Sequence, residues 1–120
     1  MSEEFISAVV GSRDTVIPGV LAERLHITQV ELASALGLSR DAVSKTARVR
    51  AGRTQRRLRD MIEIINRVLP WAGSELAAYA WYRSQPLPSF GDKTAEDLVI
   101  EGRGEAVKTY LSRIADGGYA

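Results

Sequence analysis

Apolar residues recur along most of the chain at the three- and four-residue spacing of helices. The strict alternation of apolar and polar residues that marks a half-buried strand is absent. Glycine and proline residues that favour turns separate the apolar segments. We therefore predict an all-α protein. The predicted helices cover residues 3–10, 18–26, 28–36, 40–48, 54–69, 74–83, 94–101 and 105–115.

The middle of the chain combines helix caps, a corner glycine and inward-facing apolar residues in one short stretch. Thr28 followed by Glu31 is the pattern of a capping box at a helix start. Gly37 stands where the chain leaves this helix, a position that favours a left-handed backbone. Ser39 is placed to cap the next helix, and Val43 would fill the angle between the two helices. Leu32, Ala33, Leu36 and Ala47 complete the expected inward face.

This arrangement predicts a helix-turn-helix, whose second helix lies in the major groove of DNA. An ordinary corner between two helices is the alternative. Residues at the start of a recognition helix reach base edges, whereas the cations around it reach phosphates. Asp41 has two interpretations, because its carboxylate either contacts cytosine or favours the helix N-terminus. The candidates for base contacts are Arg40, Asp41 and Ser44, those for phosphate contacts are Lys45, Arg48, Arg50 and Arg53, and Ser39 completes the predicted DNA-binding set.

A long amphipathic helix follows from Thr54. Its apolar stripe is wide enough to serve also as the seam of a dimer. On its other face, acidic and basic residues stand four positions apart, which favours ion pairs along the helix. We expect these pairs to neutralise part of the basic run and to leave its arginines as surface residues. The stripe consists of Leu58, Met61, Ile62, Ile65, Val68 and Leu69, and the expected pairs are Arg56 with Asp60, Arg59 with Glu63, and Glu63 with Arg67.

Turn residues divide the C-terminal half into three further helices. Residues 70–73 turn the chain, and Ser74 is placed to cap the first of these helices. Residues 84–93 contain prolines and a glycine that exclude a regular helix. Thr94 with Asp97 repeats the capping-box pattern. The expected inward side consists of Leu76, Ala77, Ala80 and Trp81 in the first helix, with Tyr79 and Tyr82 as added aromatic area, then Leu98, Val99 and Ile100, then Val107, Leu111 and Ile114 before a C-cap at Gly117.

Charge is distributed unevenly along the chain. The 120 residues are 45% hydrophobic, which suits one packed domain or two small units that share a core. Residues 24–67 carry ten Lys and Arg against four acidic residues, whereas residues 1–23 and 68–120 are net acidic. This distribution predicts a polyanionic partner for the middle of the chain only. A solvated helix face with internal ion pairs is the alternative for part of this charge.

The sequence offers no catalytic or metal-binding constellation. It contains no cysteine, which excludes disulfides, thiolate nucleophiles and cysteine-based zinc sites. The single histidine, His26, has no recognisable partner. Residues 102–104 are too short for a phosphate-binding loop and do not follow a strand. We therefore predict no enzyme activity, no metal and no cofactor. The acidic first residues and the absence of an apolar run of about 20 residues lead us to expect a soluble, cytoplasmic protein.

Residues 81–120 resemble the C-terminal toxin-binding domain of Xre/MbcA/ParS-type antitoxins. Members of that family carry an aromatic-x-Arg helix end, a Pro-containing loop, a Thr-Pro-x-x-Leu helix start, a glycine-interrupted link to a final helix and a small or aromatic tail. Ala95 stands where the family commonly has proline, and Asp92 where it has glycine. With the helix-turn-helix ahead of it, the likeness covers roughly residues 20–120. The matching positions are Trp81, Arg83, Pro86, Phe90, Gly91, Thr94, Leu98, Gly102, Val107, Leu111, Ile114, Gly117, Tyr119 and Ala120.

The resemblance implies the antitoxin of a type II toxin–antitoxin system. Its partner would be a RES-domain toxin, which consumes NAD⁺, and the antitoxin would form a homodimer that represses its own operon. Tyr119 and the terminal carboxylate of Ala120 suit insertion into a nucleotide cleft, with an unstructured terminus as the alternative. The predicted toxin-binding residues are Trp81, Arg83, Phe90, Gly91, Gly117, Gly118, Tyr119 and Ala120.

Two domains follow from these motifs. We predict a helix-turn-helix domain with its connecting helix at residues 1–69, and a small helical toxin-binding domain at residues 70–120. The alternative function is a helix-turn-helix transcriptional regulator without a toxin partner, whose C-terminal half only dimerises or senses a ligand.

Overall fold

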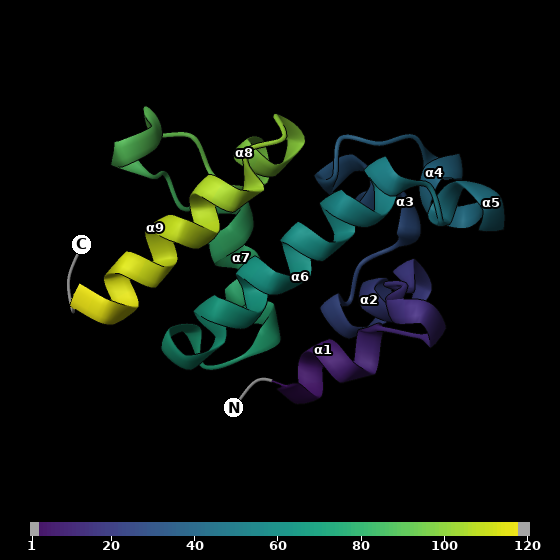
Figure 1. The fold of residues 1–120 in the computed structure, drawn as a ribbon, viewed down its shortest axis with the longest axis horizontal. Helices are drawn as coiled ribbons and strands as arrows, with labels where there is room; N and C mark the ends of the chain where they lie inside the picture. The colour runs from purple at the N-terminus through teal and green to yellow at the C-terminus, as the bar shows by residue number, and fades with distance from the viewer. Residues whose placement is uncertain (1–2, 118–120) are drawn as a thin grey trace.

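A computed structural model describes residues 3–117, which fold into a helical protein (Figure 1). The described residues form no strand, only the isolated bridges Val10 to Val16 and Leu87 to Lys93. The all-α prediction is therefore confirmed. None of the helices found in this range is long and apolar enough to cross a membrane. The elements are α1 (Glu3–Val9), η1 (Ser12–Asp14), α2 (Pro18–Leu25), α3 (Gln29–Ala35), α4 (Arg40–Ser44), α5 (Thr46–Val49), α6 (Gly52–Ala72), α7 (Glu75–Ser84), η2 (Pro88–Phe90), α8 (Ala95–Ile100) and α9 (Gly104–Gly117).

Helix α6 runs through the centre of the molecule, as Figure 1 shows. The helices α1, α5, α7, α8 and α9 all pack against it, so it joins the N-terminal and C-terminal halves. The apolar stripe predicted for this helix is buried, apart from the half-buried Leu69. Because the chain's own helices cover the stripe, it is not exposed as the dimer seam that the sequence suggested.

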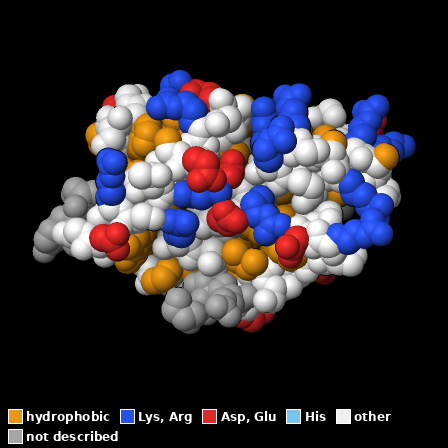
Figure 2. Space-filling view, viewed as in Figure 1, with side chains coloured by type: hydrophobic (Ala, Val, Ile, Leu, Met, Phe, Trp, Pro, Cys, Tyr) orange, Lys and Arg blue, Asp and Glu red, His pale blue; other side chains and the backbone are white. Residues whose placement is uncertain are grey.

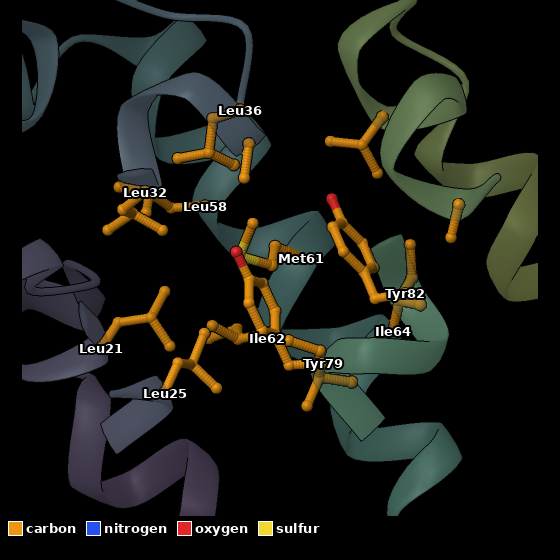
Figure 3. Close-up of a cluster of buried hydrophobic side chains, with 14 of the residues drawn as sticks. Leu21, Leu25, Leu32, Leu36, Leu58, Met61, Ile62, Ile64, Tyr79 and Tyr82 are labelled. Carbon is orange, nitrogen blue, oxygen red and sulfur yellow. The ribbon is translucent and has the colours of Figure 1, made fainter. Parts of the chain in front are cut away.

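The core is continuous across both halves of the chain. In Figure 3, Leu32 from the N-terminal half lies beside Leu58 of α6, and Leu25 lies beside Ile62, with Tyr79 of α7 in the same cluster. Tyr82 is fully buried, and burial raises the pKa of its hydroxyl well above the ordinary value. The predicted division between residues 69 and 70 thus falls inside a helix whose buried side serves both halves.

The local signals for helix ends are largely confirmed. Thr28 and Thr94 each form a complete capping box, with side-chain and backbone bonds of 2.8–3.1 Å. Ser74 accepts a hydrogen bond from the Ala77 amide at 3.0 Å. Ser39 occupies the expected N-cap position, but its side chain makes no capping hydrogen bond.

The corner glycine also brings the two halves of the chain together. Gly37 has a φ of +65°, as its place in the turn predicted. A Cβ at this residue would lie 2.9 Å from Cγ2 of Ile100, so the end of α8 packs directly on the corner. Arg57 donates to the carbonyl oxygens of Leu36 at 2.9 Å and Gly37 at 3.1 Å. These contacts fix the corner between α3 and α4 against both α6 and α8.

Helix α6 is longer than predicted. It continues through Pro70 and Trp71 to Ala72, and Gly73 ends it with a φ of +91°. Proline removes the backbone donor that would bond the Asn66 carbonyl, but only Trp71 and Ala72 follow it in the helix. The turn expected at residues 70–73 is therefore wrong for its first three residues.

The buried side of α7 differs from the predicted one. Ala78, Tyr79 and Tyr82 are buried, whereas Ala77 and Ala80 are exposed. Leu76 is 44% exposed. Both sides of this helix are apolar in the sequence, and the structure selects the side with the large aromatic rings, which bury more surface against α6.

A buried lysine joins α6 to α9. The Lys108 Nζ lies 2.7 Å from Oδ1 of Asp60, 2.6 Å from Oε1 of Glu63 and 2.9 Å from Oε2 of Glu105. Gly104 allows this close approach, because a Cβ there would overlap the Asp60 side chain. The lysine side chain is only 7% exposed.

This cluster replaces the ion pairs predicted along α6. The described structure contains none of the three predicted salt bridges, because Lys108 of α9 pairs with both Asp60 and Glu63. The predicted pairs were Arg56 with Asp60, Arg59 with Glu63, and Glu63 with Arg67. Arg59 donates instead to the Asp14 carbonyl, and Arg67 to the Lys108 carbonyl and the Ser112 hydroxyl.

Candidate functional site

The segment predicted as a recognition helix is divided into two short helices. Helix α4 ends at Ser44, and Lys45 has an extended backbone with φ of −88° and ψ of 123° before α5 begins. The continuous helix predicted for residues 40–48 is therefore wrong, and Ala47 is exposed rather than inward. The tertiary anchors explain the break, since Ala42 and Val43 are buried but α5 contains no buried residue.

All eight predicted DNA-binding residues have accessible side chains. Asp41 is half-buried and the other seven are exposed. Asp41 lies 3.7 Å from the Arg48 guanidinium, which supports a structural role for its carboxylate. Ser44 donates to the Arg40 carbonyl at 3.0 Å. In Figure 2, Lys and Arg side chains gather over the end of the molecule that contains α3, α4 and α5.

Most of these cations have no acidic partner within the described part of the chain. No carboxylate lies within 4.0 Å of Arg40, Lys45, Arg50 or Arg53 there. Arg56 also has no carboxylate within 4.0 Å, because Asp60 pairs with Lys108 instead. The structure therefore leaves more positive charge at this end than the predicted ion pairs would have allowed.

A second candidate surface lies between η2 and α9. Phe90 packs edge-on against Tyr110, with ring centroids 5.8 Å apart, and the Arg103 guanidinium lies 5.5 Å above the Phe90 ring. A hollow of about 410 Å³ adjoins these aromatic rings. It is lined by Ser89, Phe90, Ala106, Thr109, Tyr110 and Arg113.

The predicted toxin-binding residues in α7 are partly engaged within the chain. Trp81 is half-buried against the core. Arg83 donates to Glu96 at 2.6 Å and 3.2 Å and lies 5.9 Å from the Tyr79 ring centroid. The hydrogen bonds to Glu96 raise the pKa of the Arg83 guanidinium. Gly91 is exposed after η2 and Gly117 is exposed at the end of α9, whereas Gly118, Tyr119 and Ala120 lie outside the described residues.

Sequence reasoning missed an exposed tryptophan on the opposite side of α9. Trp71 is 54% exposed and borders a hollow of about 420 Å³ between the ends of α6 and α9. The sequence predicts a turn at residues 70–73 and therefore gives Trp71 no helix face. In the structure, Trp71 lies one helical turn after Arg67 on the same side of α6. The hollow is lined by Arg67, Pro70, Trp71, Leu111, Ser112, Ala115 and Asp116.

Comparison with known proteins assigns the C-terminal segment. Residues 68–117 match the family model of the antitoxin Xre/MbcA/ParS C-terminal toxin-binding domain. No curated protein and no solved structure matches the chain. The matched range contains both hollows beside α9, except for Arg67 at the edge of the Trp71 hollow. This match supports the interpretation of the protein as an antitoxin with a toxin partner. It points to a regulatory protein rather than an enzyme.

Proposed function

We propose that this protein is the antitoxin of a type II toxin–antitoxin system, which neutralises a RES-domain toxin and represses its own operon. The observation that carries the proposal is the toxin-binding domain matched by residues 68–117. The chain adds a cationic helix-turn-helix surface to that domain, at the end of the molecule where α6 begins and away from the C-terminal end of α9 (Figure 1). Because the two surfaces share no residue, we propose that one molecule binds a toxin and operator DNA at the same time.

The toxin is proposed to dock around α9, whose two sides carry the Trp71 hollow and the Phe90 hollow. Exposed tryptophan and half-buried aromatic residues beside hollows are the usual anchors of protein interfaces. Trp71 lies beside one hollow and Phe90 beside the other, both next to α9. The predicted toxin-binding residues from Trp81 to Gly91 belong to the same half of the molecule.

The operator is proposed to bind across α4 and α5. Their exposed cations without acidic partners supply the phosphate attraction that dominates DNA affinity. A homodimer would present two such surfaces to a two-fold symmetric operator. We place this activity in the cytoplasm, where operator DNA and NAD⁺ are both present.

Co-expression with the toxin tests the proposal directly. The RES-type protein encoded next to this chain should arrest growth and lower cellular NAD⁺ when expressed alone. Co-expression of this protein should restore both growth and NAD⁺, and the two proteins should co-purify. If they neither co-purify nor restore growth together, the alternative of a transcriptional regulator without a toxin partner is favoured.

Replacing Trp71 by alanine should weaken toxin binding about tenfold or more, because it removes a large exposed ring from the proposed interface. The measurement is the dissociation constant of the purified complex by calorimetry. Val30→Ala is the matched control, since Val30 is also 54% exposed but lies on α3, outside the matched domain. Equal affinity of the two variants would exclude the Trp71 side of α9 as a main toxin contact.

A further inference from the structure

A hollow of about 500 Å³ separates the N-terminal segment from α4 and α5. One wall is formed by residues 11–19, which precede the predicted helix-turn-helix. The other wall includes Ser44, Thr46 and Arg50. The N-terminal segment is net acidic in the sequence, which gave no reason to include it in a nucleic-acid surface. The fold nevertheless brings its one cation, Arg13, to this hollow.

The side chain of Gln55 connects the two walls by hydrogen bonds. The Gln55 amide oxygen accepts a hydrogen bond from the Val16 amide at 2.8 Å. The Gln55 nitrogen donates to the carbonyl oxygens of Val16 at 3.1 Å and Val49 at 2.8 Å. Arg59 also donates to the Asp14 carbonyl, which ties the loop to α6. The spacing of the walls is therefore fixed before any ligand binds.

The hollow combines polar side chains that suit an anion with an apolar lining from Val16, Ile17, Pro18, Val43 and Val49. Arg13 and Arg50 line it, both are exposed, and no carboxylate lies within 4.0 Å of either in the described chain. Asp14 follows Arg13 in the chain, but it does not line the hollow. Gln29, Ser44 and Thr46 add polar groups to the lining. Such a mixture of arginines, amide and hydroxyls is the usual phosphate-contact set in DNA-binding proteins.

A second hollow on α4 and α5 supports a strand of DNA as the occupant. It measures about 300 Å³ and shares no residue with the first. Arg48 and Arg53 line it. A recognition element in the major groove lies between two phosphate backbones. The two hollows, each lined by two arginines, fit two phosphate backbones better than they fit one small molecule.

We propose that the hollow between residues 11–19 and α4–α5 receives the phosphodiester backbone of one DNA strand, with Arg13 as a phosphate contact from outside the helix-turn-helix. This inference rests on the proposed operator binding and adds a contact that the N-terminal sequence did not predict. Arg13 contributes affinity without reading bases, because it contacts only the backbone.

The test measures binding of Arg13→Ala to two duplexes, one from the DNA upstream of the coding sequence and one of shuffled sequence. Affinity should fall about threefold to tenfold at moderate salt for both duplexes, and the slope of log affinity against log salt should decrease by about 0.9. Arg13→Lys should retain most of the affinity and slope. Arg113→Ala, an exposed arginine on α9, is the matched control and should bind as the wild type does.

The outcomes separate the inference from the proposed function. If the wild type binds neither duplex, operator binding itself is wrong and the inference falls with it. If the wild type binds and Arg13→Ala equals Arg113→Ala in affinity and slope, operator binding stands and the Arg13 contact is excluded. A loss confined to the upstream duplex would also overturn the inference, since it would indicate a base contact. Unchanged thermal melting of Arg13→Ala shows that a lost affinity does not come from unfolding.

Discussion

Replacing Lys108 by methionine should lower the free energy of unfolding by about 3–5 kcal/mol at neutral pH, the usual cost of removing one partner from a buried ion pair. The lysine side chain is 7% exposed and its Nζ lies within 3.0 Å of three carboxylates. Methionine fills a similar volume but cannot neutralise these acids. Asp60 and Glu63, which lie three residues apart on the same side of α6, would then be partly buried, unpaired charges.

The pKa of Lys108 shows that pairing with the carboxylates outweighs burial in this cluster. Burial alone lowers the pKa of a lysine, but hydrogen bonds to Asp60, Glu63 and Glu105 more than offset it, and the pKa is raised. A raised pKa means that the ammonium stabilises the fold at pH values below the ordinary lysine range, as long as its carboxylate partners are charged. On the alkaline side, this stabilisation is lost as the pH rises through the raised pKa. It is therefore fully present at neutral pH.

Denaturant unfolding at several pH values measures the effect. The difference in unfolding free energy between Lys108→Met and the wild type should narrow as the pH falls from 7 towards 4 and below, because Lys108 holds the pKa of Glu105 below its ordinary value and the stability from that pair is lost as Glu105 becomes protonated. Lys93→Met is the matched control, since Lys93 pairs with Glu101 but is 46% exposed, and it should cost at most about 1 kcal/mol. If both variants lose the same stability at every pH, the cluster is not a main link between α6 and α9.

The sequence predicted best those features that depend on neighbours along the chain. Both capping boxes, the left-handed Gly37 and the buried stripe of α6 follow from short-range spacing, and the structure confirms them. A cap needs only a hydroxyl and an amide three residues apart, so its partners are visible in the sequence. The resemblance of the C-terminal segment could be recognised for a similar reason, because its cap, loop and glycines follow one another closely in the sequence, and residues 68–117 match the family model.

The predictions that were wrong concern features that depend on residues far apart in the sequence. Asp60 and Glu63 were assigned to arginines four positions away, whereas their true partner comes from α9. The break at Lys45 likewise has no local signal, since it arises where burial of α4 ends. For the candidate site, the predicted residues that the structure describes are exposed or half-buried, but Trp71 and Arg13 became visible only when the fold placed them beside hollows.

Replacing Arg40 and Lys45 together by alanine should weaken operator binding by about 2–4 kcal/mol, or roughly 30-fold to 1,000-fold. Arg40 is exposed at the start of α4, where side chains can reach base edges. Lys45 is exposed at the break before α5, where it is free to follow a phosphate. The inward anchors of this segment are Ala42 and Val43, so the double variant should keep its fold.

Three readouts make this prediction specific. Binding of the upstream duplex should fall more than binding of a shuffled duplex, because a base contact carries sequence information and a phosphate contact does not. Toxin binding should remain unchanged, since both residues lie outside the matched domain. Lys93→Ala with Arg113→Ala removes the same charge from the C-terminal half, so equal losses of DNA affinity in the two double variants would mean that net charge alone drives binding. Loss of toxin binding together with DNA binding would instead show that Arg40 and Lys45 support the fold.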